Sequence, residues 1–132
     1  MLMLMWAMRD AVDPEIIDVL LEGGCEVELD EEPFLGVYQE IPIMRLACFA
    51  KDNAKLQISA AHKICQRMRD VDKEIKGETP LSFCLHALRE DIAMVILQYG
   101  AKGKARRGEF KEVVTWKELL RPAYEPPEGL KD

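Results

Sequence analysis

Apolar side chains recur every three or four residues along most of the chain, and glycine or proline separates one stretch from the next. This spacing places apolar side chains on one face of an α-helix, so each stretch predicts an amphipathic helix. A single short helix or helix pair cannot bury its own apolar face, so several must pack together. The predicted helices cover residues 4–8, 16–21, 42–51, 53–69, 80–88 and 91–98.

The residues at the helix ends support these boundaries. Asp13 and Thr79 each precede a proline, and their side chains can accept a hydrogen bond from the first turn of the helix that follows. Gly24 and Gly100 follow apolar stretches, where glycine can adopt the left-handed conformation that ends many helices. Residues 115–118 have the capping-box pattern, which predicts one more short helix near the C-terminus.

The segments between the helices are polar. Residues 25–40 contain an acidic cluster, Glu26 to Glu32, and predict a loop or extended excursion that could receive a basic partner or simply be solvated. Residues 71–78 predict a turn. Residues 102–108 are basic and predict a solvated turn that could also contact phosphate or an acidic surface, and residues 109–114 are predicted to be briefly extended. The basic residues are Lys102, Lys104, Arg106 and Arg107.

One pattern occurs twice in the chain. Residues 15–27 and residues 91–102 both place an acidic side chain before an apolar stripe that ends near a glycine. The second copy follows the run Gly77-Glu-Thr-Pro-Leu, and residues 77–101 together resemble the ankyrin repeat, whose first helix opens on G-x-T-P-L. Residues 4–27 resemble the first helix of that repeat loosely and its second helix well, and residues 42–48 resemble the opening of its first helix.

The resemblance implies an all-α fold, an ankyrin-type stack of about three helix-turn-helix repeats with a short C-terminal capping helix. The expected domain spans residues 1–122, and residues 123–132 are expected to form a flexible tail. Gly24 and Gly100 are about ten residues further apart than two ankyrin periods, so the middle of the stack is expected to be irregular. The expected repeats cover residues 1–32, 38–70 and 71–102, and the cap covers 109–122.

The chain of 132 residues is long enough for one domain with its own core. Its formal net charge of −6 argues against a general nucleic-acid-binding protein, which normally has a basic face. No apolar run approaches the roughly 20 residues that span a bilayer, and residues 1–8 lack the basic start of a signal peptide. We therefore expect a soluble protein with no membrane partner, whose first residues form an amphipathic or buried helix.

Four cysteines and two histidines carry the reactive side chains. None of the cysteines forms a C-x-x-C pair, so they are expected to be reduced thiols of a cytoplasmic protein, with a location inside a host cell also open. Cys84 and His86 are two residues apart, and a helix points such side chains in different directions, so no metal site is expected. The only possible metal constellation combines this pair with His62 and Cys65, which lie three residues apart and can share one face of a predicted helix.

The sequence contains no glycine-rich phosphate loop and no HExxH motif, and no serine or cysteine lies on a recognisable nucleophile turn. We therefore expect a protein that is not an enzyme and has no cofactor. A zinc- or thiol-dependent enzyme, built on the histidines and cysteines, is the third class considered.

Ankyrin stacks bind their partners through a concave surface of turn tips and first helices. The resemblance therefore implies a non-enzymatic protein–protein interaction module that acts as an adaptor or inhibitor of a protein partner. The expected partner-binding residues are Tyr38, Gln39, Glu40, Met44, Arg45, Asp72, Lys73, Glu74, Lys76, Glu78, Ser82 and His86.

The competing class is a self-assembling structural or chaperone-like protein that uses its apolar repeat ends. The run from Met1 to Met5 is very apolar for a terminal repeat, so a homo-oligomer could form through the N-terminal helix. Trp6 and Trp116 lie in the first and last predicted units, where each could cover one end of the stack.

Overall fold

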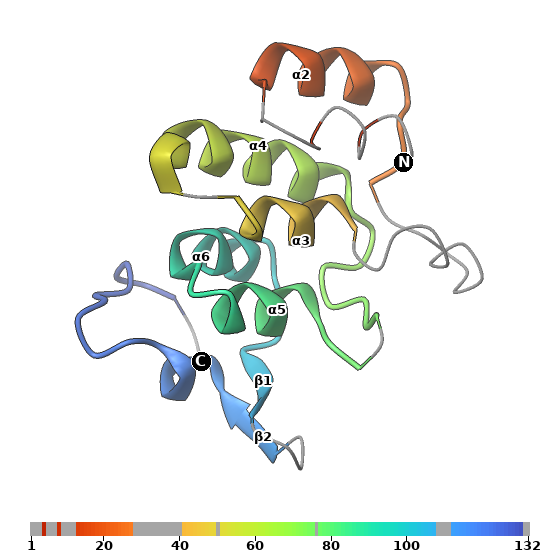
Figure 1. The fold of residues 1–132 in the computed structure, drawn as a ribbon. Helices are drawn as coiled ribbons and strands as arrows, with labels where there is room; N and C mark the ends of the chain where they lie inside the picture. The colour runs from red at the N-terminus through yellow and green to blue at the C-terminus, as the bar shows by residue number, and fades with distance from the viewer. Residues whose placement is uncertain are drawn as a thin grey trace.

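The protein is mostly helical in the computed structural model, which describes residues 4, 8, 13–27, 41–49, 51–75, 77–107 and 112–130 (Figure 1). Every helix predicted between residues 13 and 98 is present, and the boundaries lie within a few residues of the predicted ones. The helices are α2 (Pro14–Glu22), α3 (Pro42–Ala47), α4 (Ala54–Arg67), α5 (Pro80–His86) and α6 (Glu90–Gln98), with the 3-10 turns η2 (Lys51–Asn53) and η3 (Trp116–Leu119).

The predicted helix ends are confirmed in their hydrogen bonds. The Asp13 carboxylate accepts from the backbone N–H of Glu15 at 2.9 Å, and the Thr79 hydroxyl accepts from the backbone N–H of Ser82 at 3.2 Å. Gly24 and Gly100 have φ of +85° and +93°, a region that L side chains rarely adopt. These local signals explain where α2 and α5 begin and where α2 and α6 end.

The helices lie in successive layers along one direction of the molecule (Figure 1). Helix α2 contacts α4, the pair of α3 and α4 forms the next layer, and α5 and α6 follow, with α3 against α5 and α4 against α6. Lys63 on α4 donates to Asp18 on α2 at 3.0 Å, and His62 Nδ1 on α4 lies 3.1 Å from the hydroxyl of Tyr99. Polar contacts therefore join α4 to the layer on each side of it.

One connected apolar core runs through these layers. The largest fully buried side chains include Ile17 from α2, Leu46 from α3, Ile64 from α4 and Ile96 from α6. Two residues of the segment predicted to be the first helix, Leu4 and Met8, are also fully buried, and the Met8 N–H donates to the Leu4 carbonyl at 3.0 Å. The rest of that predicted helix lies outside the described residues.

The structure is compatible with the all-α expectation and adds one short hairpin, which corrects the turn predicted near the C-terminal end. The strands β1 (Lys104–Arg107) and β2 (Glu112–Thr115) form an antiparallel pair, with Lys104 opposite Thr115 and Ala105 opposite Val114. Residues 102–108 were predicted to form a solvated turn because they are rich in basic residues. The correction has a physical reason, since Ala105 and Val114 turn to one face and are buried while their neighbours Lys104 and Val113 are exposed.

The segment after the hairpin also differs from prediction. The expected capping box is absent, because the Thr115 hydroxyl lies 3.4 Å from the Glu118 carboxylate and makes no side-chain cap, and the turn that follows is 3-10. Residues 123–132 were expected to be loose. In the structure Tyr124 and Leu130 are partly buried and pack against the core.

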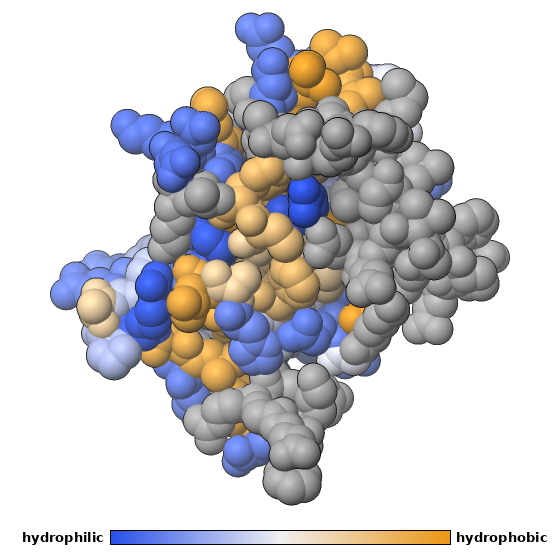
Figure 2. All heavy atoms as spheres, in the orientation of Figure 1, coloured by the Kyte–Doolittle hydropathy of each residue, from blue (hydrophilic) through white to orange (hydrophobic). Residues whose placement is uncertain are grey.

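Helix α2 leaves apolar side chains in contact with solvent. Ile16 and Val19 are 46% and 67% exposed. They are three residues apart and so lie on the same helix face. Figure 2 shows apolar atoms at the surface at the α2 end of the molecule.

Candidate functional site

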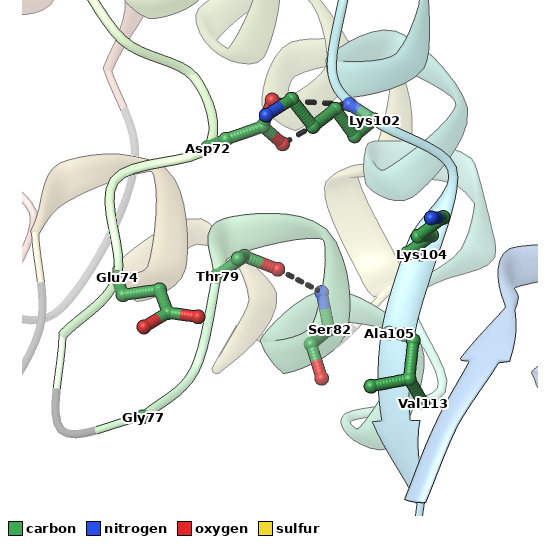
Figure 3. A pocket seen from close by; sticks show the side chains of 9 residues that line it. All are labelled: Asp72, Glu74, Gly77, Thr79, Ser82, Lys102, Lys104, Ala105 and Val113. Atoms are coloured by element: carbon green, nitrogen blue, oxygen red, sulfur yellow. Dashed lines mark hydrogen bonds between the residues drawn. The ribbon is translucent and has the colours of Figure 1, made fainter.

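A pocket of about 460 Å³ lies between the turn that precedes α5 and the hairpin of β1 and β2 (Figure 3). The turn and the start of α5 form one side, and the hairpin and the residues leading into it form the other. The lining residues are Asp72, Glu74, Gly77, Thr79, Ser82, Lys102, Lys104, Ala105 and Val113.

The turn side of the pocket is held by local hydrogen bonds. The backbone N–H of Asp72 donates to the Asp70 carboxylate at 2.9 Å. Ile75 and Glu78 exchange two backbone hydrogen bonds, of 2.8 and 3.1 Å. Gly77 completes this tight turn at φ +82°, where a side chain would strain the backbone. These hydrogen bonds therefore hold the backbone of the turn in one conformation, and the exposed Glu74 side chain extends from it.

Asp72 connects the two sides of the pocket. Both of its carboxylate oxygens lie 3.1 Å from the backbone N–H of Lys102, just before β1 (Figure 3). A charged acceptor makes such a hydrogen bond stronger than a neutral pair would. Asp72 was predicted as a partner-binding residue, and in the structure its carboxylate fixes the start of the hairpin against the turn.

The hairpin side combines charge with apolar surface. Lys104 is exposed, Ala105 is buried, and Val113 is 56% exposed. Acidic Glu74 therefore lies on the turn side of the pocket, and basic Lys104 lies on the hairpin side together with the apolar Val113 (Figure 3). This arrangement suits a ligand that carries both polar and apolar groups, such as a segment of polypeptide.

Three predicted partner-binding residues line the pocket, namely Asp72, Glu74 and Ser82. Two more are paired nearby: His86 Nδ1 on α5 lies 2.9 Å from Glu78 Oε1 at the end of the turn. The resemblance had predicted that these residues share one surface, because it assigned the turn and the first helix of a repeat to the same binding face.

Other predicted residues occupy different positions. Met44 and Ser82 are only 1% and 2% exposed, which corrects their assignment as surface contacts: Met44 packs in the core, and Ser82 is enclosed in the first turn of α5. Arg45 is half-buried with its guanidinium 5.3 Å from the centre of the Phe49 ring, and Lys73 is half-buried in the turn. Tyr38, Gln39, Glu40 and Lys76 lie outside the described residues.

The sequence predicted an extended segment at residues 109–114, but it did not predict the strand at Lys104–Arg107 or the pairing of the two. Lys102 and Lys104 were noted only as a basic group, and Val113 and Ala105 were not singled out. The available signal was the alternation of buried and exposed side chains expected for a strand, in a segment containing Val113, Val114 and Thr115.

The cysteines occupy environments that differ in exposure. Cys65 and Cys84 are buried, Cys25 is half-buried and Cys48 is exposed, and all four are free thiols. Burial raises the pKa of the Cys65 thiol to about 12 and also raises the pKa of Cys84. Both thiols therefore stay protonated at neutral pH, the form that is a poor nucleophile and a poor metal ligand.

No group of three or more histidine, cysteine, aspartate or glutamate side chains within the described ranges is placed to hold a metal ion. His62 is instead in contact with Tyr99, with ring centres 5.7 Å apart in an edge-on arrangement. No helix in the described part of the chain is long and apolar enough to cross a bilayer.

Comparison with known proteins gives no relative from which a function could be carried over. No protein-family model matches the chain, and neither the curated proteins nor the solved structures contain a match. The candidate site therefore stands on its own geometry.

Proposed function

We propose that the protein is a non-enzymatic protein–protein interaction module, an adaptor or inhibitor built as a short ankyrin-type stack. The layered order of α2, the pair α3 and α4, and the pair α5 and α6 supports the stack. The Thr79 cap before α5 and the left-handed Gly24 and Gly100 after α2 and α6 also support it, because the repeat pattern has a threonine before its first helix and a glycine after its second.

The observation that carries the interaction function is the pocket beside the turn. It gathers opposite charges and an exposed valine from segments on both sides of α5. Partner contacts at such a site would include Glu74 on the turn and Lys104 on β1, whose side chains are exposed. Charged groups at the border of an interface mainly determine which partner binds and how fast it associates.

Reversing the charge of either Glu74 or Lys104 in the pocket should weaken binding of the natural partner. Glu74→Lys and Lys104→Glu are each expected to lower its recovery in affinity capture by about threefold to fivefold, as for loss of a solvent-exposed ion pair. Capture from the native source, followed by quantitative mass spectrometry, measures the proteins retained by each variant. Glu22→Lys and Lys55→Glu make the same charge changes at exposed positions on α2 and α4 and serve as matched controls.

The proposed pocket is wrong if the same proteins are retained equally by the pocket variants and by the controls. Circular dichroism of each variant checks that the helices are unchanged. Asp72 is unsuitable for this experiment, because its carboxylate holds the hairpin to the turn and a substitution there would alter the pocket itself.

A second candidate function is self-association through α2, favoured by the exposure of Ile16 and Val19. Size-exclusion chromatography with light scattering should then give a mass above the 15.1 kDa of one chain. Ile16→Lys with Val19→Lys should restore the monomer, whereas Leu56→Lys, at another exposed apolar position on α4, should not. A wild-type protein that stays monomeric at every concentration contradicts this function.

A further inference from the structure

The register of the hairpin determines which backbone N–H and C=O groups of β1 form hydrogen bonds to β2 and which point away from it. The backbone N–H of Trp116 donates to the carbonyl of Gly103 at 2.8 Å, which makes these two residues a hydrogen-bonded pair just beyond the strands. Hydrogen-bonded pairs alternate along an antiparallel ladder, so the next such pair is Ala105 with Val114. The backbone N–H and C=O of Lys104 therefore point away from β2.

The outward edge of β1 faces the pocket. In Figure 3, β1 lies between β2 and the start of α5, and Lys104 and Ala105 line the pocket from this strand. Helix α5 contacts β1, so the pocket is bounded on that side by the residues from Thr79 to Ser82. An extended chain in the pocket would thus lie along the outward edge of β1, beside the backbone groups of Lys104.

A two-stranded ribbon with an outward row of N–H and C=O groups is a ready template for another strand. We propose that the partner binds by adding an extended segment to the edge of β1, as a third strand that hydrogen-bonds to the backbone of Lys104. This inference rests on the proposed interaction function and specifies how the partner is recognised.

The two faces of the hairpin define the chemistry of that segment. Lys104, Val113 and Thr115 share the exposed face, whereas Ala105 and Val114 share the buried face. A side chain of the added strand directly opposite Lys104 lies on the exposed face, where an acidic group is favoured across the pair. The neighbouring side chains turn toward Ala105 and Ser82, which are small and buried, so small residues are favoured there.

The occupant is therefore an extended peptide segment with one acidic side chain flanked by small ones. The backbone supplies affinity, and the alternate side chains supply specificity. Glu74, on the opposite side of the pocket, disfavours a second acidic side chain pointing toward the turn.

A displayed library of random peptides of about twelve residues, selected on the full protein, provides the probe. One enriched peptide is then synthesised in three forms: unmodified, N-methylated at alternate residues, and N-methylated at the other set of alternate residues. Only one of the two methylated forms blocks the N–H groups that face β1. We expect that form to lose about tenfold or more in affinity, and the other to bind nearly as the unmodified peptide does.

A protein variant tests the same contact from the other side. Lys104→Pro removes an N–H that points away from β2, a position where an edge strand tolerates proline, and should lower affinity about tenfold. Lys104→Thr keeps the N–H and removes the charge, so its loss should be smaller. The methylated peptides keep the experiment decisive even where the proline variant is poorly folded.

The outcomes separate this inference from the function on which it rests. Equal binding of both methylated forms overturns strand addition. If that peptide nevertheless loses affinity for Glu74→Lys and Lys104→Glu, the pocket remains an interaction site with another binding mode. A second outcome also overturns recognition of a short extended segment: the library yields no enriched peptide, while capture of the natural partner still depends on Glu74 and Lys104.

Discussion

Replacing Arg89 with methionine is expected to lower the free energy of unfolding by about 3 to 5 kcal/mol, the range for removing one partner of a buried charged network. The side chain is 3% exposed. Its Nη1 donates to the carbonyl of Phe49 at 2.8 Å, and its Nη2 donates to Gln57 Oε1 at 2.6 Å. The same guanidinium donates to both carboxylate oxygens of Asp91, at 3.1 and 3.0 Å.

The size of the expected effect follows from what the substitution leaves behind. Gln57 is itself 3% exposed, so its side-chain oxygen would lose the guanidinium donor in a place where water cannot easily replace it. Phe49 lies just after α3, and Arg89 lies just before α6, so the network joins two successive layers. Methionine fills a similar volume but supplies no donor.

Urea denaturation followed by circular dichroism measures the loss. Arg89→Lys keeps the charge but cannot make the forked contact to Asp91, so it should recover only part of the stability. Lys55→Met, at an exposed site on α4, is the matched control and should change stability by less than about 0.5 kcal/mol. A loss below about 1 kcal/mol for Arg89→Met would contradict the structural role assigned to the network.

The features that could be predicted from the sequence depend on neighbouring residues, whereas the features that could not be predicted depend on contacts between residues far apart in the chain. Asp13, Thr79, Gly24 and Gly100 act on backbone groups within a few residues, so their caps and stops are visible in the sequence and are confirmed. The layered packing also follows from the helical spacing of apolar residues, because each helix needs a neighbour to cover its apolar face.

Arg89 and Glu90 illustrate the limit of such reasoning. Three consecutive charged residues at the start of a helix are typical of a solvated surface, yet Glu90 is 1% exposed and accepts from Arg121 at 2.5 and 2.8 Å. Asp91 is a local partner of Arg89, but Phe49 and Gln57, which also bind Arg89, and Arg121, which binds Glu90, lie more than thirty residues away in the sequence. Nothing in the local pattern indicates them.

The candidate site was predicted only on one side. The turn with Asp72 and Glu74 followed from the resemblance. On the hairpin side, residues 102–108 were interpreted as a solvated basic turn, and only residues 109–114 were predicted to be extended. Strand pairing depends on a partner strand and on packing against α5, so the charge of Lys102 and Lys104 outweighed the weaker strand signal of Val113 to Thr115. The pocket exists because both sides come together, and Asp72 makes that contact.

Trp116 is expected to have the other large effect, because it holds the hairpin side of the pocket to the helices. It is fully buried at the start of η3, and η3 contacts α5, β1 and β2. Its backbone N–H also donates to the carbonyl of Gly103, next to the paired strands. Trp116→Ala removes a large apolar side chain from the core and should lower the free energy of unfolding by about 3 to 5 kcal/mol.

The neighbouring Lys117 provides the matched control. Its ammonium lies 5.5 Å from the centre of the Trp116 ring at an exposed position, so Lys117→Ala should cost at most about 1 kcal/mol. Trp116→Phe should fall between the two variants, because it keeps an aromatic ring of smaller volume. Urea denaturation of the three variants measures this order.

The same variants connect stability to the pocket. If Trp116 positions the hairpin, Trp116→Ala should weaken peptide binding at the edge of β1. This should hold without urea, under conditions in which helices α2 to α6 remain folded. Unchanged stability together with unchanged binding would mean that the hairpin holds its position without the tryptophan. In that case Asp72, with its two contacts to the backbone of Lys102, would be the principal connection between the turn and β1.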